Sequence, residues 1–171
     1  IMPSLVGSEM CIRDSYLMTT TTGAAGEVMR HLEFVTQCLH PEWQVHLSSV
    51  TEQWAQFAVA GPKSRELLNG LLEQPINNES FPFMACGDVR LGGVAARLFR
   101  ISFSGEHAYE IAAPARYGAA LFDLLVARAE ALEGGAYGME ALNVLRLEKG
   151  HITHAETVSY THLRAHETRH D

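Results

Sequence analysis

The sequence predicts an α+β fold, with antiparallel or mixed sheets and helices packed on one face. Three observations support this prediction. Segments with a two-residue alternation, which is typical of strands, lie between segments whose apolar residues recur every three or four positions, as in helices. The two kinds of segment do not alternate strictly, as they would in a parallel α/β sheet. Gly92-Gly93 also joins two candidate strands directly, as a two-residue hairpin turn does.

The first half of the chain contains five expected elements. Residues 16–22 are rich in β-formers and residues 44–50 alternate, so both segments are expected to be strands, as are residues 54–60. Apolar side chains at three- and four-residue steps predict helices at 23–39 and 63–72.

The second half begins with a polar segment, residues 73–82, whose prolines and asparagines predict a loop. Strands are then expected at 83–91, 94–103 and 107–112. Helices are expected at 114–132 and 139–149, the second ended by Gly150.

Composition and charge restrict the classes of function. The chain has 171 residues, enough for one ordinary domain, and its net charge of −7 disfavours a nucleic-acid-binding surface. No apolar run approaches the ~20 residues that a membrane span needs. Cys11, Cys38 and Cys86 are widely spaced and odd in number, which indicates neither a disulfide framework nor a metal site. We therefore expect a reducing, cytoplasmic location.

Both ends of the chain look foreign to the rest. Residues 1–15 and 159–171 resemble translated sequencing-adaptor text, so we expect one partial domain at 16–158 that is truncated at both ends. His162, His166 and His170 would form a stripe on one helix face, which suggests a metal site. Because they lie in this foreign tail, we assign no metal site to them.

Glu110 is the principal candidate for a binding residue. It lies inside an expected strand between Tyr109 and Ile111, where a carboxylate is unfavourable unless something pairs with it. One interpretation is a carboxylate that accepts two parallel N–H bonds from a flat donor, such as a guanidinium or an amino-pyrimidine ring. The other is a solvent-exposed Glu bonded to a surface Arg, and the residue alone favours this second interpretation.

A family resemblance begins at the same place. Phe103-Ser-Gly-Glu-His-Ala-Tyr-Glu-Ile111 resembles the Tyr-Thr-Gly-Glu-x-Gly-aromatic-Glu-Ile signature of folate-dependent aminomethyltransferases, the glycine-cleavage T-protein family. The resemblance implies a folate-binding fold in which Glu110 holds the pterin ring of tetrahydrofolate and Phe103 lines the pocket. Phe103 stands where the family usually has Tyr, so a contact made by that hydroxyl is lost. Tyr109 is expected in the core or stacked beside the pocket.

The resemblance continues in the last expected helix. Arg146-Leu-Glu148 and Gly150 match the family's Arg-Leu-Glu-Ala-Gly, and Arg146 is a candidate folate contact or a structural ion-pair residue. Leu142-Asn143 replaces the family's Arg-Asp pair, so no contact is carried over there. With Leu-Met-Thr-Thr-Thr-Thr-Gly and Val-Ala-Gly-Pro-Lys63, these motifs resemble the C-terminal folate domain of heterotetrameric sarcosine oxidase α subunits across nearly all of residues 16–158.

That resemblance implies a specific reaction. The parent enzymes demethylate sarcosine oxidatively, and the imine intermediate reaches tetrahydrofolate in this domain to give 5,10-methylenetetrahydrofolate and glycine. The flavins and NAD bind elsewhere, and the implied partners are the β, γ and δ subunits. The family's catalytic Asp precedes residues 16–22, where this chain has the foreign segment. We do not transfer its role to Asp14, name no catalytic residue, and expect the fragment alone to be inactive.

Other functions stay open at this point. The chain could be an independent aminomethyltransferase, or a non-catalytic folate-binding or subunit-contact module that kept the fold and lost the chemistry. His151 and His154, with Glu156 near them, could suggest a metal, but the further ligands that would complete a site are not in view. The absence of a Gly-x-Gly-x-x-Gly fingerprint argues against NAD or FAD binding by this segment.

Overall fold

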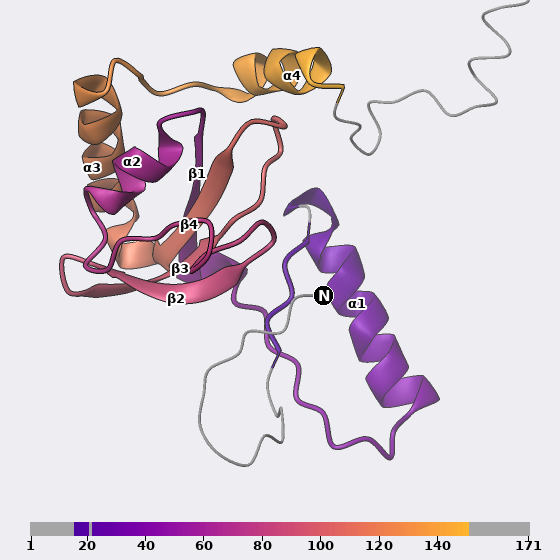
Figure 1. Ribbon diagram of the computed structural model, residues 1–171. Helices are drawn as coiled ribbons and strands as arrows, with labels where there is room; N and C mark the ends of the chain where they lie inside the picture. The colour runs from indigo at the N-terminus through magenta and orange to yellow at the C-terminus, as the bar shows by residue number, and fades with distance from the viewer. Residues whose placement is uncertain (1–15, 21, 151–171) are drawn as a thin grey trace, which may run out of the picture.

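Four strands form one antiparallel sheet in the computed structural model, which describes residues 16–20 and 22–150 (Figure 1). Their order across the sheet is β1 (Trp54–Ala60), β4 (Ala108–Pro114), β3 (Val94–Phe99) and β2 (Cys86–Leu91). Strands β1 and β2 are therefore the two edges. The antiparallel α+β fold expected from the sequence is confirmed.

The hairpin between β2 and β3 forms at the expected two glycines. Gly92 and Gly93 both have positive φ angles, 51° and 83°, and the register pairs Leu91 with Val94 directly across the turn. Two successive residues in the left-handed region make the type I′ turn whose twist matches that of the flanking strands, and glycine adopts that conformation without steric penalty.

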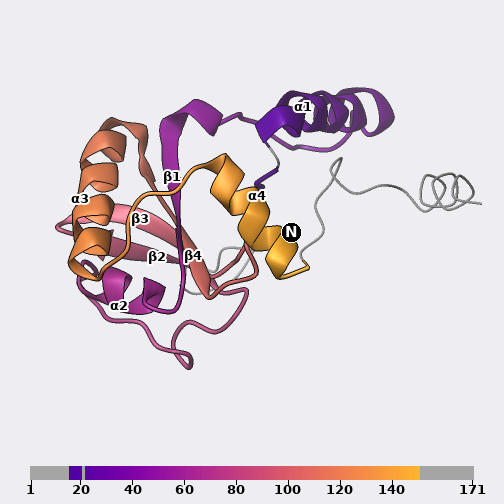
Figure 2. The same ribbon diagram turned by 90° about the horizontal axis from the view of Figure 1, so that it is seen from above.

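One face of the sheet carries the core. Helices α2 (Ser64–Asn69) and α3 (Gly118–Ala131) pack there, as the two views in Figures 1 and 2 show. Phe57 pairs with Ile111 and Val59 pairs with Tyr109, so these four side chains point to the same side. The buried apolar cluster combines sheet and helix residues: Val59, Leu67, Leu68, Leu72, Ile76, Phe81, Leu91, Ala96, Leu98, Tyr109, Ile111, Ala113, Leu121 and Leu125.

The opposite face of the sheet carries polar side chains, and the C-terminal helix α4 (Met139–Glu148) lies near one end of the sheet (Figure 1). Lys149, just after α4, lies with its Nζ 2.6 Å from a carboxylate oxygen of Glu106, in the connection between β3 and β4. The segment 132–138 leads into α4. At its start, the Lys63 Nζ donates a hydrogen bond of 3.2 Å to the Leu132 carbonyl and so anchors the segment.

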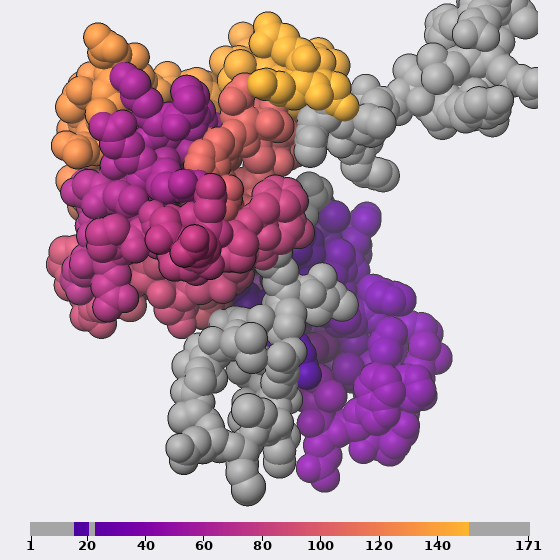
Figure 3. All heavy atoms as spheres, viewed as in Figure 1, coloured from indigo at the N-terminus to yellow at the C-terminus, as the bar shows by residue number. Residues whose placement is uncertain are grey.

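Helix α1 (Ala25–Phe34) lies apart from the sheet (Figures 1 and 2), and Figure 3 shows it with the neighbouring chain as a separate mass. A 3₁₀ turn, Thr22–Ala24, precedes it and a π-helical turn, Val35–Leu39, continues it, so the helix expected at 23–39 is present. None of the residues of α1 is buried. Its apolar stripe therefore contributes little to the core.

Two of the strand predictions are wrong. Residues 16–20, the described part of the segment 16–22, form no strand, and Thr22 belongs to a 3₁₀ turn. Residues 44–50 form no strand either. Neither segment pairs with the sheet, and a strand needs a partner that satisfies its backbone hydrogen bonds as well as β-forming side chains.

The other elements match within a few residues. The strand expected at 94–103 ends at Phe99, and the one expected at 83–91 begins at Cys86. Short 3₁₀ turns, Thr51–Gln53 and Ala115–Tyr117, precede β1 and α3. Among the described residues, no helix has both the length and the apolar character needed to cross a bilayer.

Candidate functional site

Glu110 lies in the middle of β4 on the face opposite to the core. The register places it between Ala58 of β1 and Phe99 of β3, and its side chain is half-buried. Within the described part of the chain, its hydrogen-bond donor is the Gln56 amide, from the edge strand β1. Burial raises the pKa of the Glu110 carboxyl, and the Gln56 hydrogen bond opposes that rise.

No cation offsets the Glu110 carboxylate among the described residues. Arg97 of β3 points to the same face, but its Nε lies 3.2 Å from a carboxylate oxygen of Asp88, and its guanidinium stands 5.4 Å above the Trp54 ring. The sequence left two interpretations of Glu110 open, and the structure disfavours a surface ion pair with Arg. The carboxylate keeps acceptor capacity beyond the one bond from Gln56.

The charge of Glu110 also acts on the Tyr137 phenol. Burial, and then the negative charge of Glu110, raise the pKa of the Tyr137 phenol. Tyr137 comes from the segment 132–138, so this segment and β4 meet at the candidate site. Neither Gln56 nor Tyr137 was singled out from the sequence. Gln56 could have been, because it is the one polar side chain in Trp-Ala-Gln-Phe-Ala-Val-Ala.

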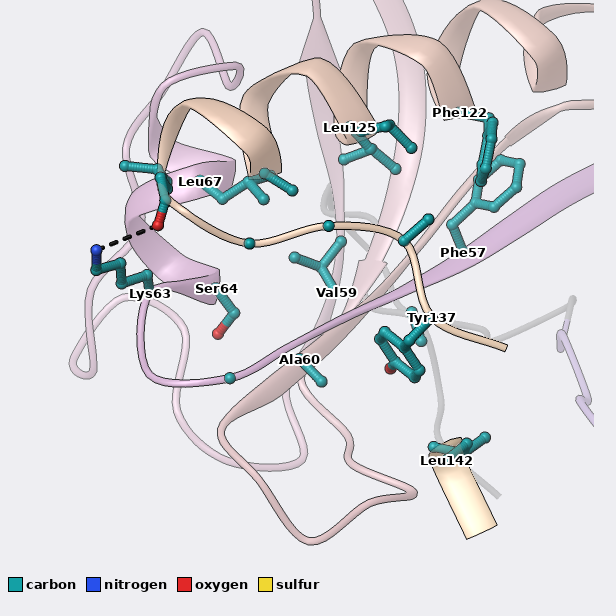
Figure 4. Close-up of a pocket in the computed structure, with 18 of the residues that line it drawn as sticks. Phe57, Val59, Ala60, Lys63, Ser64, Leu67, Phe122, Leu125, Tyr137 and Leu142 are labelled. Carbon is teal, nitrogen blue, oxygen red and sulfur yellow. Dashed lines mark hydrogen bonds between the residues drawn. The ribbon is translucent and has the colours of Figure 1, made fainter. Parts of the chain in front are cut away.

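A cavity of about 700 Å³ opens along the edge strand β1 (Figure 4). Gln56 and Tyr137 line it, so the cavity adjoins the group around Glu110. Most of the lining residues labelled in Figure 4 are apolar: Phe57, Val59, Ala60, Leu67, Phe122, Leu125 and Leu142. Cavities of this size and character, with a few polar groups at one side, are typical small-molecule sites.

One polar clamp holds the outer wall of this cavity in place. The Lys63 Nζ donates to the Leu132 carbonyl, which is the dashed line in Figure 4, and also lies 3.6 Å from a carboxylate oxygen of Glu133. The contact fixes the start of the segment 132–138 beside α2. The remaining wall is formed by backbone and small side chains of Gly134, Gly135, Ala136 and Gly138.

Tyr109, the neighbour of Glu110, points to the other side of the sheet. It is 0% exposed and belongs to the core cluster. The Arg65 Nε donates a hydrogen bond of 3.0 Å to the Tyr109 hydroxyl, which lies 3.1 Å from the His107 Nε2. An Arg65 Nη also lies 3.2 Å from that His107 nitrogen. Both contacts are satisfied if His107 Nε2 is an unprotonated acceptor.

Phe103 and Arg146 come from two other parts of the chain. Phe103 lies in the connection between β3 and β4 and is 40% exposed. Arg146 lies on α4, is 4% exposed, and its Nε donates a hydrogen bond of 3.3 Å to the Asn143 side-chain carbonyl. A role for these two residues and Tyr109 in binding stays a prediction.

Metal binding finds no support in the described part of the chain, where no group of three or more His, Cys, Asp or Glu residues could hold an ion. The possible metal ligands His151, His154, Glu156, His162, His166 and His170 lie outside the described residues, as does Asp14, which stands near the place of the family's catalytic Asp.

Comparison with known proteins defines the class. Residues 10–166 match the family model described as the GCVT N-terminal domain, so the chain belongs to that family. The match includes residues 10–15 and 159–166, which resemble foreign sequence, and the domain boundaries at 16 and 158 stay predictions. The family contains proteins of several activities, so the closer relatives are informative.

The chain is 50% identical over 143 residues, 82% of its length, to the sarcosine oxidase subunit alpha of Rhizobium meliloti (strain 1021). It is 45% identical over 141 residues to the sarcosine oxidase subunit alpha of Corynebacterium sp. (strain U-96). It is 31% identical over 113 residues, 66% of its length, to an aminomethyltransferase of Mycobacterium bovis. The likeness to sarcosine oxidase α subunits expected from the motifs is confirmed. The chain spans only 14% and 15% of the two α subunits.

Proposed function

We propose that this chain binds tetrahydrofolate and is the one-carbon-accepting domain of a sarcosine oxidase α subunit. The observation that carries the proposal is the half-buried Glu110 carboxylate, which has Gln56 as its hydrogen-bond donor and no cationic partner among the described residues. Such a group fits a flat ring with adjacent N–H donors, because two parallel N–H bonds would satisfy the oxygens that Gln56 leaves available.

The neighbouring residues support a pterin-sized ligand at this place. The aliphatic and aromatic walls of the 700 Å³ cavity adjoin Gln56 and Tyr137 and would exclude water from the ring. Exclusion of water strengthens the hydrogen bonds that Glu110 makes. In the proposal Phe103 and Arg146 supply further folate contacts, while the burial of Tyr109 favours a packing role.

Tetrahydrofolate, when bound, would take up the one-carbon unit from sarcosine demethylation as 5,10-methylenetetrahydrofolate, with glycine as the other product. This chain would bind and orient the acceptor. The flavins, the NAD and the β, γ and δ subunits of the parent enzyme belong to the same proposal and would lie outside this segment. The 45–50% identity to sarcosine oxidase α subunits supports this assignment.

A second candidate is a T-protein-type aminomethyltransferase, which the 31% identity to the Mycobacterium enzyme favours. The motif comparison argues against it, because Leu142-Asn143 replaces the Arg-Asp pair of that family. In the structure Leu142 lines the apolar cavity rather than supplying a charge there. A binding or subunit-contact module without catalytic chemistry is a third candidate.

The test is a Glu110→Gln variant of the full chain, with Glu66→Gln as the matched control on the exposed side of α2. Tetrahydrofolate binding is measured by titration calorimetry under anaerobic conditions. Loss of a charged partner from a buried hydrogen bond typically costs on the order of 2–5 kcal/mol, so we expect binding to weaken at least ~30-fold in Glu110→Gln and to stay unchanged in Glu66→Gln.

The Glu110→Gln variant should also fold well. Since burial raises the pKa of Glu110, the charged form is unfavourable in the folded protein, and the neutral amide removes that penalty while its carbonyl still accepts from Gln56. We therefore expect equal or higher resistance to urea. Equal folate affinity in the variant and the wild-type chain would refute the placement of the pterin at Glu110.

A further inference from the structure

A second, smaller hollow lies near the end of the sheet where β3 connects to β4. Its volume is about 370 Å³, and its walls are Phe83, Arg100, Ser102, Gly105, Glu106, His107 and Ala108. Arg100 follows Ala96 and Leu98 at two-residue steps, which places its side chain toward the core face of the sheet, as for Tyr109. The hollow is therefore distinct from the group around Glu110.

The arginines at this hollow lack negative partners in the described ranges. Arg100 donates through Nη1 to the Phe81 carbonyl at 2.8 Å. Arg65, next to His107, contacts the Tyr109 hydroxyl, the Asn78 amide oxygen and the His107 ring. The Phe81 carbonyl, the Tyr109 hydroxyl and the Asn78 amide are neutral, and the His107 ring can be neutral. The two guanidinium charges are thus bound to dipoles and not to carboxylates.

Among the described residues that line the hollow, the one acidic side chain already has a partner. Glu106 lies 2.6 Å from the Lys149 Nζ, at the end of α4. That contact neutralises Glu106, and the positive charge of Arg65 and Arg100 stays in excess. His107 responds to this field: burial, and then the charges of Arg65 and Arg100, lower the pKa of its ring.

Two polar atoms of the hollow are buried and have no hydrogen-bond partner among residues 16–20 and 22–150, the Arg100 Nε and the Ser102 hydroxyl oxygen. Folded proteins rarely leave such atoms unsatisfied, and each instance calls for an explanation. Both are in side chains that line the same hollow, two residues apart on the chain. A ligand that accepts hydrogen bonds from a guanidinium and a hydroxyl would satisfy both.

We propose that this hollow binds the carboxylate group of a small organic acid, with Arg100 and Ser102 as its donors. A guanidinium pairs with a carboxylate through two parallel N–H bonds, and the Ser102 hydroxyl can supply a third donor. The volume admits a ligand of a few heavy atoms, and the exposed Phe83 ring, at 69% exposure, forms an apolar lip for its carbon part. The inference does not depend on the folate proposal.

The probe is acetate, with acetamide as its neutral counterpart, added to the full chain at constant ionic strength. The side-chain Nε–H signal of Arg100 and the ring signals of His107 are followed by NMR. We expect saturable shifts with acetate and at least tenfold weaker shifts with acetamide. Because a bound anion offsets the charges of Arg65 and Arg100, the pKa of His107 should rise when acetate binds.

Three variants complete the test. Arg100→Gln should weaken acetate binding at least tenfold, and Arg116→Gln, an exposed arginine that stacks on Tyr117, should leave it unchanged. Ser102→Ala keeps the Arg100 bond to Phe81, so it reports on the hollow even if Arg100→Gln unfolds, and it should weaken binding several-fold. Shifts that do not saturate, that acetamide reproduces, or that survive Ser102→Ala unchanged would overturn the proposal.

Discussion

Replacement of Tyr109 by Phe separates the two faces of the sheet. Tyr109 and Glu110 are adjacent in β4, yet Tyr109 packs in the core while Glu110 lies on the opposite face of the sheet, bonded to Gln56. Phe keeps the aromatic ring in its place and removes only the hydroxyl. The variant should therefore lower the stability of the fold and leave tetrahydrofolate affinity unchanged, which is the opposite of the result expected for Glu110→Gln.

The size of the effect follows from the two contacts of the Tyr109 hydroxyl. It accepts from the Arg65 Nε at 3.0 Å and lies 3.1 Å from the His107 Nε2. A hydrogen bond to a charged group contributes about 1.5–3 kcal/mol, but Arg65 is only half-buried and water can replace part of what it loses. We expect the free energy of unfolding to fall by about 1–2 kcal/mol.

Urea unfolding followed by tryptophan fluorescence measures this change. With a denaturant slope of roughly 2 kcal/mol/M, the midpoint should move down by about 0.5–1 M. Titration of the same variant with tetrahydrofolate supplies the second reading. The reasoning is refuted if Tyr109→Phe weakens folate binding more than about threefold at unchanged stability, because the Tyr109 hydroxyl would then serve the ligand and not the core.

Two further predictions concern the end of the sheet near His107. Because the pKa of His107 is lowered from its ordinary 6.5, the native state binds fewer protons there than the unfolded chain, and the free energy of unfolding should fall as pH decreases below about 6.5. Urea midpoints between pH 7.5 and 5.0 should show a shallower slope in His107→Gln; identical slopes would contradict this. Gly105→Ala should loosen α4 and destabilise the fold by about 1–2 kcal/mol, since Gly105 has φ +76° and an added Cβ would lie 2.8 Å from the Lys149 Cβ. Hydrogen exchange should rise in α4, whereas Gly23→Ala, which meets open space, should show no such rise.

The sequence predicted the elements that carry their own local signals. Gly92-Gly93 gave the hairpin between β2 and β3, because few residues other than glycine adopt two successive positive φ angles. Gly150, with φ +69°, marks the end of α4 in the same way. Residues 44–50 show the polar and apolar alternation of a strand, but a strand forms only where a second segment pairs with it. The absence of a partner could not be read from one of them.

Of the residues that meet at the candidate site, only Glu110 was predictable from the sequence. Glu110 was recognisable because a carboxylate in an apolar strand is unusual and because it is the last Glu of a family signature. Gln56 lies 54 residues earlier in the chain, and Tyr137 follows α3, so their approach to Glu110 depends on the sheet order and on the course of the segment 132–138. For Tyr109 the sequence left two positions open, the core or a place beside the pocket, and the structure places its ring in the core, on the opposite face of β4 from Glu110.

The position of β1 at the edge of the sheet has a consequence for folding kinetics. Strands β2, β3 and β4 are neighbours in sequence and can pair through short connections, whereas β1 must meet β4 across a separation of about fifty residues, such as the 54 between Gln56 and Glu110. The entropy lost on loop closure grows with this separation and is paid before the contacts form. We expect β1 to join the sheet last, so that the side-chain hydrogen bond from Gln56 to Glu110 forms only in the final step of folding.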